Sequence, residues 1–259
     1  MIPPRSILIT GASSGLGAAL ARLYAAPGIV LALTGRDPAR LAAVVADCAA
    51  RGAAMRSASL DVSDAEAVGG WVRAMDDADP LDLVVAAAGI SGGPQPGEVT
   101  EGVGSATRQV MTNLLGVMHV MEPLLPRLLA RGRGHVAMVS SVAGYRGLPY
   151  SPGYSASKAG VRAYGDGLRA ALRPHGVACS VIVPGFFDSP MTDRFIGDKP
   201  FMLTLDRAAA LARRGLDARR GRIVFPRLLG LGLQATDLMP AALGDWILRR
   251  VHFHIRARD

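Results

Sequence analysis

A tyrosine, a lysine and a serine in the middle of the chain have the types and the spacing for proton-transfer chemistry. Lys158 follows Tyr154 by four residues, and Ser141 precedes Tyr154 by thirteen. Residues four apart share one face of a helix, so the ammonium can sit beside the phenol. A phenol with a pKa of about 10 transfers protons poorly at neutral pH, and a nearby positive charge lowers that pKa. With the serine holding a substrate oxygen, this set could interconvert a ketone and a secondary alcohol.

A glycine-rich turn near the amino end predicts a nucleotide site. An apolar run at 6–10 is typical of a buried strand, and residues 18–24 have helical spacing. Glycines let the backbone approach a pyrophosphate, and a helix N-terminus offers free N–H groups to it. The residues of this turn that we expect at the cofactor are Gly11, Ser13, Ser14, Gly15, Leu16 and Gly17.

The turn, the serine and the Tyr154–Lys158 pair, in this order, resemble the short-chain dehydrogenase/reductase family over about residues 5–190. The resemblance implies hydride transfer to or from a nicotinamide, with Tyr154 exchanging the proton and Ser141 binding the substrate oxygen. Lys158 would lower the Tyr154 pKa and hold the nicotinamide ribose. Asn113 would position a water that links Lys158 to solvent. Besides Tyr154 and Lys158, the implied cofactor contacts are Asp61, Val62, Ala88, Gly89, Pro184, Gly185 and Ser189.

The chain departs from the family pattern in one place. Residues 86–89 read Ala-Ala-Ala-Gly, where the family usually has Asn-Asn-Ala-Gly. The first asparagine normally ties neighbouring strands together, and its loss should cost roughly 1 kcal/mol without removing a catalytic group. Nearby rivals for the catalytic roles fit less well: Ser140 misses the family spacing, and Tyr145 and Tyr150 have no lysine four residues later.

The residue that closes the second predicted strand decides the cofactor. Gly35 stands where the family's NAD-selecting aspartate would be, and Arg36 follows it. A guanidinium grips a phosphate through paired hydrogen bonds, so we predict NADP(H), with NAD(H) as the alternative if Arg36 is only a solvated surface charge. Asp37 is predicted to cap the helix that begins at Pro38, and Ser151 the helix that begins at Pro152.

Apolar runs and helical segments alternate along the chain. The fold class is therefore α/β, a Rossmann-type doubly wound, mainly seven-stranded parallel sheet with helices on both faces, predicted as one domain over 1–259. Strands are expected near 6–10, 29–34, 55–59, 81–87, 134–140, 177–183 and 222–225. Helices are expected near 15–26, 38–51, 64–77, 103–130, 152–173 and 204–220.

Composition narrows the alternatives. The two cysteines lie far apart, and Cys179 stands in an apolar run typical of a buried strand. No cluster of metal-ligand residues is visible, so we expect no metal site. Because no signal peptide or membrane-spanning run is visible either, we expect a cytoplasmic protein. The net charge of +8 suggests nucleic-acid binding as a function, but the sequence contains no recognisable nucleic-acid-binding module. A catalytically silent nucleotide-binding homologue remains the alternative function. A nucleotide-sugar isomerase or dehydratase would need a larger carboxy-terminal domain.

The segment after Gly185 would shape the substrate pocket. It predicts a wide apolar pocket and an apolar or lipid-like carbonyl substrate, although some of its side chains must belong to the core. Its large side chains are Phe186, Phe187, Met191, Phe195, Ile196, Phe201, Met202 and Leu203.

The last part of the chain is the least family-like. From Asp206 to Asp259, eleven arginines against five aspartates carry +6 of the net charge of +8. Residues 228–233 are an apolar run, and 238–253 predict a short amphipathic helix. We interpret this segment first as a pocket cover or partner contact, and second as peripheral contact with an anionic membrane. The resemblance also implies a homodimer or homotetramer packed through the helices near 103–130 and 152–173.

Overall fold

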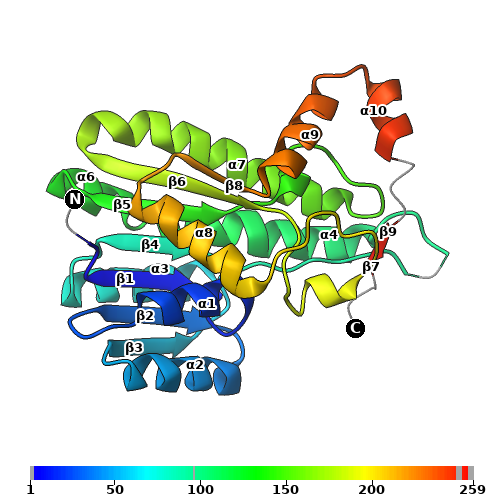
Figure 1. Cartoon of the computed structure of the whole chain (residues 1–259). Helices are drawn as coiled ribbons and strands as arrows, with labels where there is room; N and C mark the ends of the chain where they lie inside the picture. Colours follow the sequence, from blue (N-terminus) through cyan, green and yellow to red (C-terminus); the bar gives the residue numbers. More distant parts are fainter. Residues whose placement is uncertain (1–2, 96, 249–252, 256–259) are drawn as a thin grey trace.

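Seven parallel strands form one sheet in the order β3-β2-β1-β4-β5-β6-β8 (Figure 1). The computed structural model describes residues 3–95, 97–248 and 253–255. Every residue of β1 and β4 is buried, because helices cover both faces of the sheet, whereas the edge strand β3 is largely exposed. The predicted doubly wound parallel sheet is confirmed. Its strands are β1 Ser6–Thr10, β2 Val30–Gly35, β3 Ala54–Ser59, β4 Leu83–Ala86, β5 Gly134–Val139, β6 Val177–Pro184 and β8 Arg222–Phe225.

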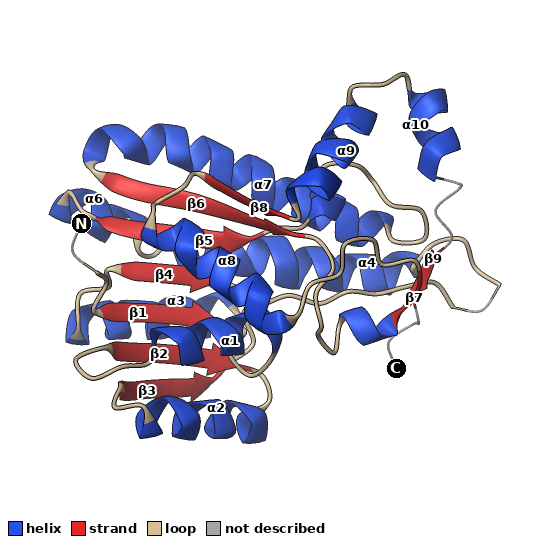
Figure 2. Cartoon of the chain, viewed as in Figure 1, coloured by secondary structure: helices blue, strands red, loops and turns tan. Residues whose placement is uncertain are grey.

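Helices pack on the two faces over separate apolar clusters (Figure 2). Leu20 lies in the cluster beneath α1 Gly15–Tyr24, α2 Pro38–Ala50 and α8 Leu205–Asp217. Val120 lies in the cluster on the opposite face, together with side chains of α3 Ala65–Ala78, α5 Gly116–Met121, α6 Leu125–Arg131 and α7 Pro152–Leu172. Short 3-10 turns cover Val142–Gly144 (η2), Arg173–His175 (η3) and Thr192–Arg194 (η4).

The helix expected near 103–130 is not one element. Helix α4, Gly102–Val110, runs into a π-helical turn, η1 Met111–Leu115, and then into α5. The chain turns after Met121, and α6 begins at Leu125. Pro123 and Pro126 cannot donate a backbone N–H, which explains why the helix breaks there. The π-helical turn contains Asn113, and such turns are frequent at functional sites.

The carboxy-terminal elements differ from the expectation. The apolar run at 228–233 belongs to α9 Arg227–Asp237, and the helix expected at 238–253 is shorter, α10 Ala241–Leu248. Phe253 lies instead in a three-residue strand, β9 Phe253–Ile255, which pairs antiparallel with β7 Phe195–Gly197, and residues 249–252 lie outside the described residues. Helix α9 packs against β8 through Leu229 and Leu233, and α10 follows it at the top right of Figure 1. Three-residue strands have too little periodicity to be read from sequence.

Candidate active site

The glycine-rich turn packs against the end of β4. Gly11 and Gly15 adopt φ values of 67° and 53°, which favour glycine. A Cβ on Gly11 would lie 2.7 Å from the Cα of Ala88, and one on Gly17 would lie 2.5 Å from the carbonyl oxygen of Gly11. Helix α1 follows with neither a side-chain cap nor an acidic residue in its first turn. This bare, tightly packed helix N-terminus fits the pyrophosphate of a dinucleotide.

Thr10 ties the end of β1 to the segment that follows β4, where the family's asparagine is missing. Its Oγ1 accepts hydrogen bonds from the backbone N–H groups of Ala87 at 3.2 Å and Ala88 at 3.3 Å. The side chain of Thr10, the last residue of β1, therefore joins the end of β1 to the segment that follows β4.

Arg36 lies where β2 ends, beside the glycine turn. A Cβ on Gly35 would lie 2.8 Å from Ser13 Oγ, so the end of β2 and the turn are in contact. The Arg36 Nη1 is 3.7 Å from Asp61 Oδ2, and both side chains are close to half exposed. Burial alone would raise the pKa of Asp61, but hydrogen bonds from Ser63 and the Arg36 charge bring that pKa below its usual value. Arg36 is thus held loosely at the surface.

The predicted helix caps had different outcomes. Asp37 caps α2 as predicted, accepting from the backbone N–H of Arg40 at 2.9 Å. The prediction for Ser151 was wrong in its detail: Ser151 occupies the N-cap position of α7, but its hydroxyl makes no cap hydrogen bond and donates to the Gly92 carbonyl at 3.1 Å. Glu101 accepts from the first backbone N–H groups of α7 instead. It lies far upstream in sequence, so no local signal around residue 151 could have indicated it.

Ser141, Tyr154 and Lys158 meet at the carboxyl end of β5. The Tyr154 phenol lies next to the Ser141 side chain. Lys158 Nζ lies 5.8 Å from the centre of the Tyr154 ring and donates to the Val139 carbonyl at 2.9 Å. The rival Ser140 is buried and donates its hydroxyl to the Lys158 carbonyl at 2.7 Å, so it holds the helix against the sheet.

The electrostatics of this set differ from the expectation. Burial raises the pKa of Tyr154, and the polar side chain of Ser141 beside it only partly opposes that rise. Burial also lowers the pKa of Lys158 to about 8. The Lys158 ammonium points to the Val139 carbonyl, so the expected lowering of the Tyr154 pKa is not found in this geometry.

Asn113 is fully buried beside Lys158. Its Oδ1 accepts from the Ile90 N–H at 2.7 Å, and its Nδ2 donates to the Ile90 carbonyl at 2.9 Å and to Ser157 Oγ at 3.0 Å. A Cβ on Gly89 would lie 3.3 Å from both Asn113 Oδ1 and Lys158 Nζ. Because Gly89 has no side chain, Asn113 and Lys158 can both pack closely against the loop that follows β4.

Most of the other predicted cofactor residues lie at or just after strand ends, and Ser189 lies further on, in the turn before η4. Pro184 closes β6, and the Gly185 N–H donates to the Phe225 carbonyl at 2.7 Å. Ser189 Oγ lies 3.0 Å from Thr192 Oγ1 and accepts from the Thr192 N–H, so this hydroxyl is engaged within its own turn. Val62 is buried after β3, with His119 Nδ1 2.9 Å from its carbonyl oxygen.

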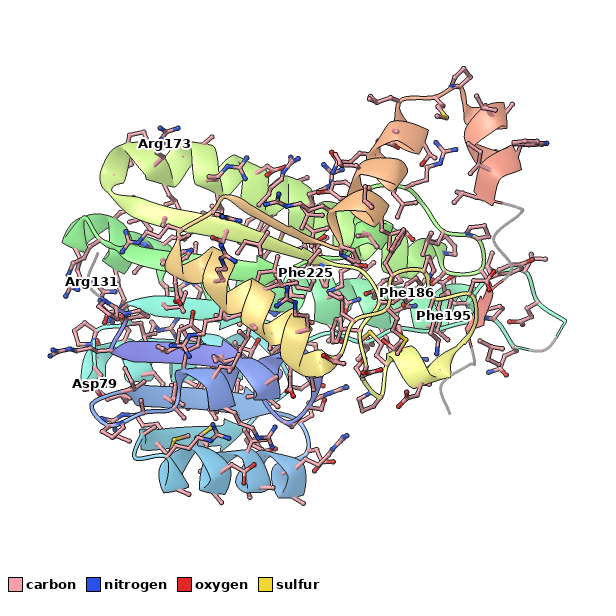
Figure 3. The ribbon with its side chains drawn as sticks, viewed as in Figure 1. Asp79, Arg131, Arg173, Phe186, Phe195 and Phe225 are labelled. Carbon is pink, nitrogen blue, oxygen red and sulfur yellow. The ribbon has the colours of Figure 1, made fainter. Side chains whose placement is uncertain are left out.

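Seven of the eight side chains expected in an apolar pocket fall into three groups, and the eighth, Met191, is partly buried directly before η4. Phe186 and Phe195 pack ring to ring, with 4.8 Å between their centres (Figure 3). Phe187 and Leu203 pack against the apolar cluster beneath α8 and belong to the core. The exposed group is Ile196, Phe201 and Met202.

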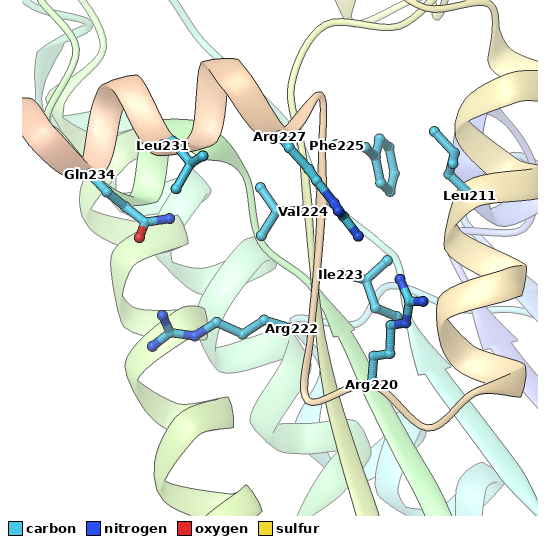
Figure 4. Close-up of a pocket in the computed structure, with 9 residues that line it drawn as sticks. All are labelled: Leu211, Arg220, Arg222, Ile223, Val224, Phe225, Arg227, Leu231 and Gln234. Carbon is cyan, nitrogen blue, oxygen red and sulfur yellow. The ribbon is translucent and has the colours of Figure 1, made fainter.

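A cavity of about 270 Å³ lies at the outer edge of the sheet, between β8, α8 and α9 (Figure 4). Its polar lining is Arg220, Arg222, Arg227 and Gln234, and it contains none of the predicted site residues.

Within the described residues, no group of His, Cys, Asp and Glu could hold a metal ion, and both cysteines are free and buried. Over the same ranges, every helix is too short or too polar to cross a membrane.

Comparison with known proteins gives the family. The family model described as short chain dehydrogenase matches residues 5–199. An uncharacterized oxidoreductase of Myxococcus xanthus is 35% identical over 252 residues, 95% of this chain and 97% of that protein. An alcohol dehydrogenase of Thermococcus sibiricus complexed with 5-hydroxy-NADP has a TM-score of 0.73 at 26% identity, covering 85% of this chain and 95% of its own.

A short-chain dehydrogenase/reductase of Burkholderia phymatum, in complex with NAD, shares the fold with a TM-score of 0.80 at 24% identity over 95% of each chain. The glycine turn, the serine and the tyrosine–lysine pair lie within the residues that the family model matches. The chain belongs to the short-chain dehydrogenase/reductase family and is an oxidoreductase of that type.

Proposed function

We propose that the protein is an NADP(H)-dependent oxidoreductase that interconverts a carbonyl group and a secondary alcohol. The observation that carries the proposal is the meeting of Ser141, Tyr154 and Lys158 beside a bare, glycine-lined helix N-terminus. A cofactor site without the proton-transfer set would fit the alternative, a catalytically silent nucleotide-binding homologue. Both halves of the site are present in this chain.

When bound, the nicotinamide supplies or accepts the hydride at the substrate carbon. Ser141 holds the substrate oxygen and stabilises the charge that develops on it. Tyr154 gives its proton to that oxygen during reduction and takes it back during oxidation. Lys158 holds the nicotinamide ribose, and Asn113 fixes the loop after β4 while positioning a water that links Lys158 to solvent.

The decisive test is Tyr154→Phe. This variant removes the proton donor and leaves the rest of the side chain, so turnover should fall at least about 1,000-fold while NADPH binding stays within about twofold. Turnover is measured as carbonyl-dependent consumption of NADPH, and binding as a change in NADPH fluorescence. Substantial residual turnover would remove Tyr154 from this role, and wild-type protein inactive on every carbonyl tested would favour the silent homologue.

The preference for NADP(H) rests on Arg36. Its guanidinium lies just past the end of β2, and Gly35 puts no acidic side chain at the NAD-selecting position. Arg36→Ala should raise the KM for NADPH about tenfold or more and leave that for NADH nearly unchanged. Arg51→Ala, an exposed arginine at the end of α2, is the matched control. Wild-type turnover with NADH equal to or better than that with NADPH would contradict the preference.

The substrate class that we favour is an apolar or lipid-like carbonyl, supported by the Phe186–Phe195 pair after β6. A panel of apolar ketones, acyl thioesters and sugars with NADPH tests it, and a clear preference for sugars would overturn it.

Peripheral contact with anionic membrane is the companion proposal, supported by the exposed Leu228, Leu238 and Trp246 on and between α9 and α10. Failure to sediment with anionic liposomes at low salt would exclude it.

Assembly as a homodimer or homotetramer, through α4 to α7, is the last part of the proposal. Exposed apolar side chains on these helices, Val103 and Met111 among them, are compatible with a covered face. Sedimentation equilibrium should give a mass that is a multiple of the 27.0 kDa of one chain. A species of one chain at micromolar concentration would contradict the assembly.

A further inference from the structure

A row of polar residues runs along the helix that packs beside the catalytic helix. Glu101, Ser105, Gln109 and Asn113 are spaced by four, so they share one face from the start of α4 to the π-helical turn. This helix contacts α7, which carries Tyr154 and Lys158. Glu101 and Gln109 are buried, as is Asn113. A buried polar row against the catalytic helix needs a reason, because burying such groups is unfavourable unless they are hydrogen-bonded.

The two ends of this row hold the two backbone groups of Tyr154. At one end, Glu101 Oε1 accepts from the N–H groups of Gly153 at 2.7 Å and Tyr154 at 3.2 Å. At the other end, Asn113 donates to Ser157 Oγ at 3.0 Å, and Ser157 donates to the Tyr154 carbonyl at 2.7 Å. Gln109 joins the row to Glu101 by donating to the same Oε1 at 3.3 Å.

The surroundings are shaped for the Glu101 carboxylate. Position 153 is a glycine, and a Cβ there would lie 2.9 Å from Glu101 Oε1 and 2.7 Å from the Ala106 Cβ. The Ser151 hydroxyl, which would be the local cap, is directed to Gly92. The other carboxylate oxygen, Glu101 Oε2, is buried without a hydrogen-bond partner among the described residues. A glutamine at this position can therefore keep every hydrogen bond that Glu101 accepts.

We propose that Glu101 is a positioning residue that fixes Tyr154 at the start of α7 and offsets the positive end of that helix at the phenol. This inference rests on the proposed function. The N-terminus of α7 favours a phenolate, and a carboxylate placed there favours the neutral, proton-bearing phenol. Among the described residues, Lys158 from the same helix and Ser141 from the segment after β5 lie beside the phenol, whereas Glu101 contacts the Tyr154 backbone N–H. Glu101 thus helps to keep a proton on Tyr154 for carbonyl reduction.

The test separates charge from position by measuring the pKa of Tyr154 itself. Protein labelled at the tyrosine 13Cζ and saturated with NADP+ is titrated by NMR, and Tyr154→Phe assigns the signal among the five tyrosines. Glu101→Gln keeps the cap and removes the charge, so the pKa of Tyr154 should fall by about 0.3 to 1 unit. Glu98→Gln, an exposed glutamate of the same loop, should leave it unchanged. An unchanged Tyr154 pKa in Glu101→Gln would overturn the inference.

Glu101→Asp makes the complementary change, because it keeps the charge and withdraws the carboxylate from the two N–H groups. Its kcat should fall about 10- to 100-fold with the KM for NADPH unchanged, since small misplacements of a reacting group are costly. A kcat within twofold of wild type would overturn the positioning role. The NMR titration needs no substrate, so a protein without measurable turnover would refute the proposed function and leave this inference still testable.

Discussion

The proposed site and the carboxy-terminal helices are built in opposite ways. In the site, Asn113 and Lys158 are buried, and their polar atoms are hydrogen-bonded to the backbone. On and between α9 and α10, large apolar side chains face outward, with Leu238 89% exposed and Leu228 70% exposed. The match to the family model ends at residue 199, before these helices begin. The proposed chemistry therefore lies where burial and hydrogen bonding leave the side chains little freedom, and the exposed apolar side chains lie beyond the part that the family model matches.

The largest effect is expected from a substitution in the glycine-rich turn, where the packing around Gly11 leaves no room for a side chain. Gly11→Val forces a β-branched side chain onto a φ of 67° and a Cβ to within 2.7 Å of the Ala88 backbone. Opening the turn should displace the α1 N-terminus from the pyrophosphate. We expect NADPH affinity to fall at least about 100-fold, measured by fluorescence titration.

Gly28 provides the matched control for that substitution. It has a φ of 81°, but a Cβ there would meet nothing within 4 Å. Gly28→Val therefore carries the conformational strain without the clash, and cofactor affinity should stay near that of wild type. Equal losses of affinity in both variants would mean that backbone strain, and not the contact with Ala88, controls the turn.

Sequence reasoning succeeded where contacts are local or recur with a fixed period. Apolar runs located each of the seven strands of the sheet, and Asp37 was identified as a cap because it lies directly before Pro38. The cap of α7 was missed because its carboxylate comes from Glu101, and the tie between β1 and β4 because Thr10 supplies it. Both depend on residues about 50 to 80 positions apart that only the fold brings together. The pairing of β7 with β9 is of the same kind.

A second prediction concerns the buried framework below the site. His135 in β5 is buried, with its Nε2 2.8 Å from Ser180 Oγ, and burial lowers its pKa to about 4. An unfolded histidine has a pKa of about 6.5, so between these values the unfolded chain binds a proton that the folded chain does not. Stability should fall as the pH drops through this window, by roughly 2 to 3 kcal/mol at pH 4.5 from His135 alone.

Urea unfolding at pH 7 and pH 4.5 measures this contribution. His135→Gln can still bond with Ser180 but has no proton to take up, so it should lose about 2 to 3 kcal/mol less than wild type between the two pH values. His175→Gln, at an exposed position in the turn before β6, should behave as wild type. An identical pH dependence for wild type and His135→Gln would show that His135 is not what makes the folded state sensitive to acid.

The smallest expected effect is in the carboxy-terminal segment, and it could break the comparison. Leu238 is 89% exposed in the turn between α9 and α10, so Leu238→Ser should change the free energy of unfolding by less than about 0.5 kcal/mol. The buried Leu216 of α8 is the control, since Leu216→Ala should cost about 2 to 5 kcal/mol. If Leu238→Ser instead costs more than about 2 kcal/mol, and that loss disappears on dilution, then a second copy of the chain covers Leu238. A large loss that persists on dilution would mean that the same chain covers it, as a lid over the site would.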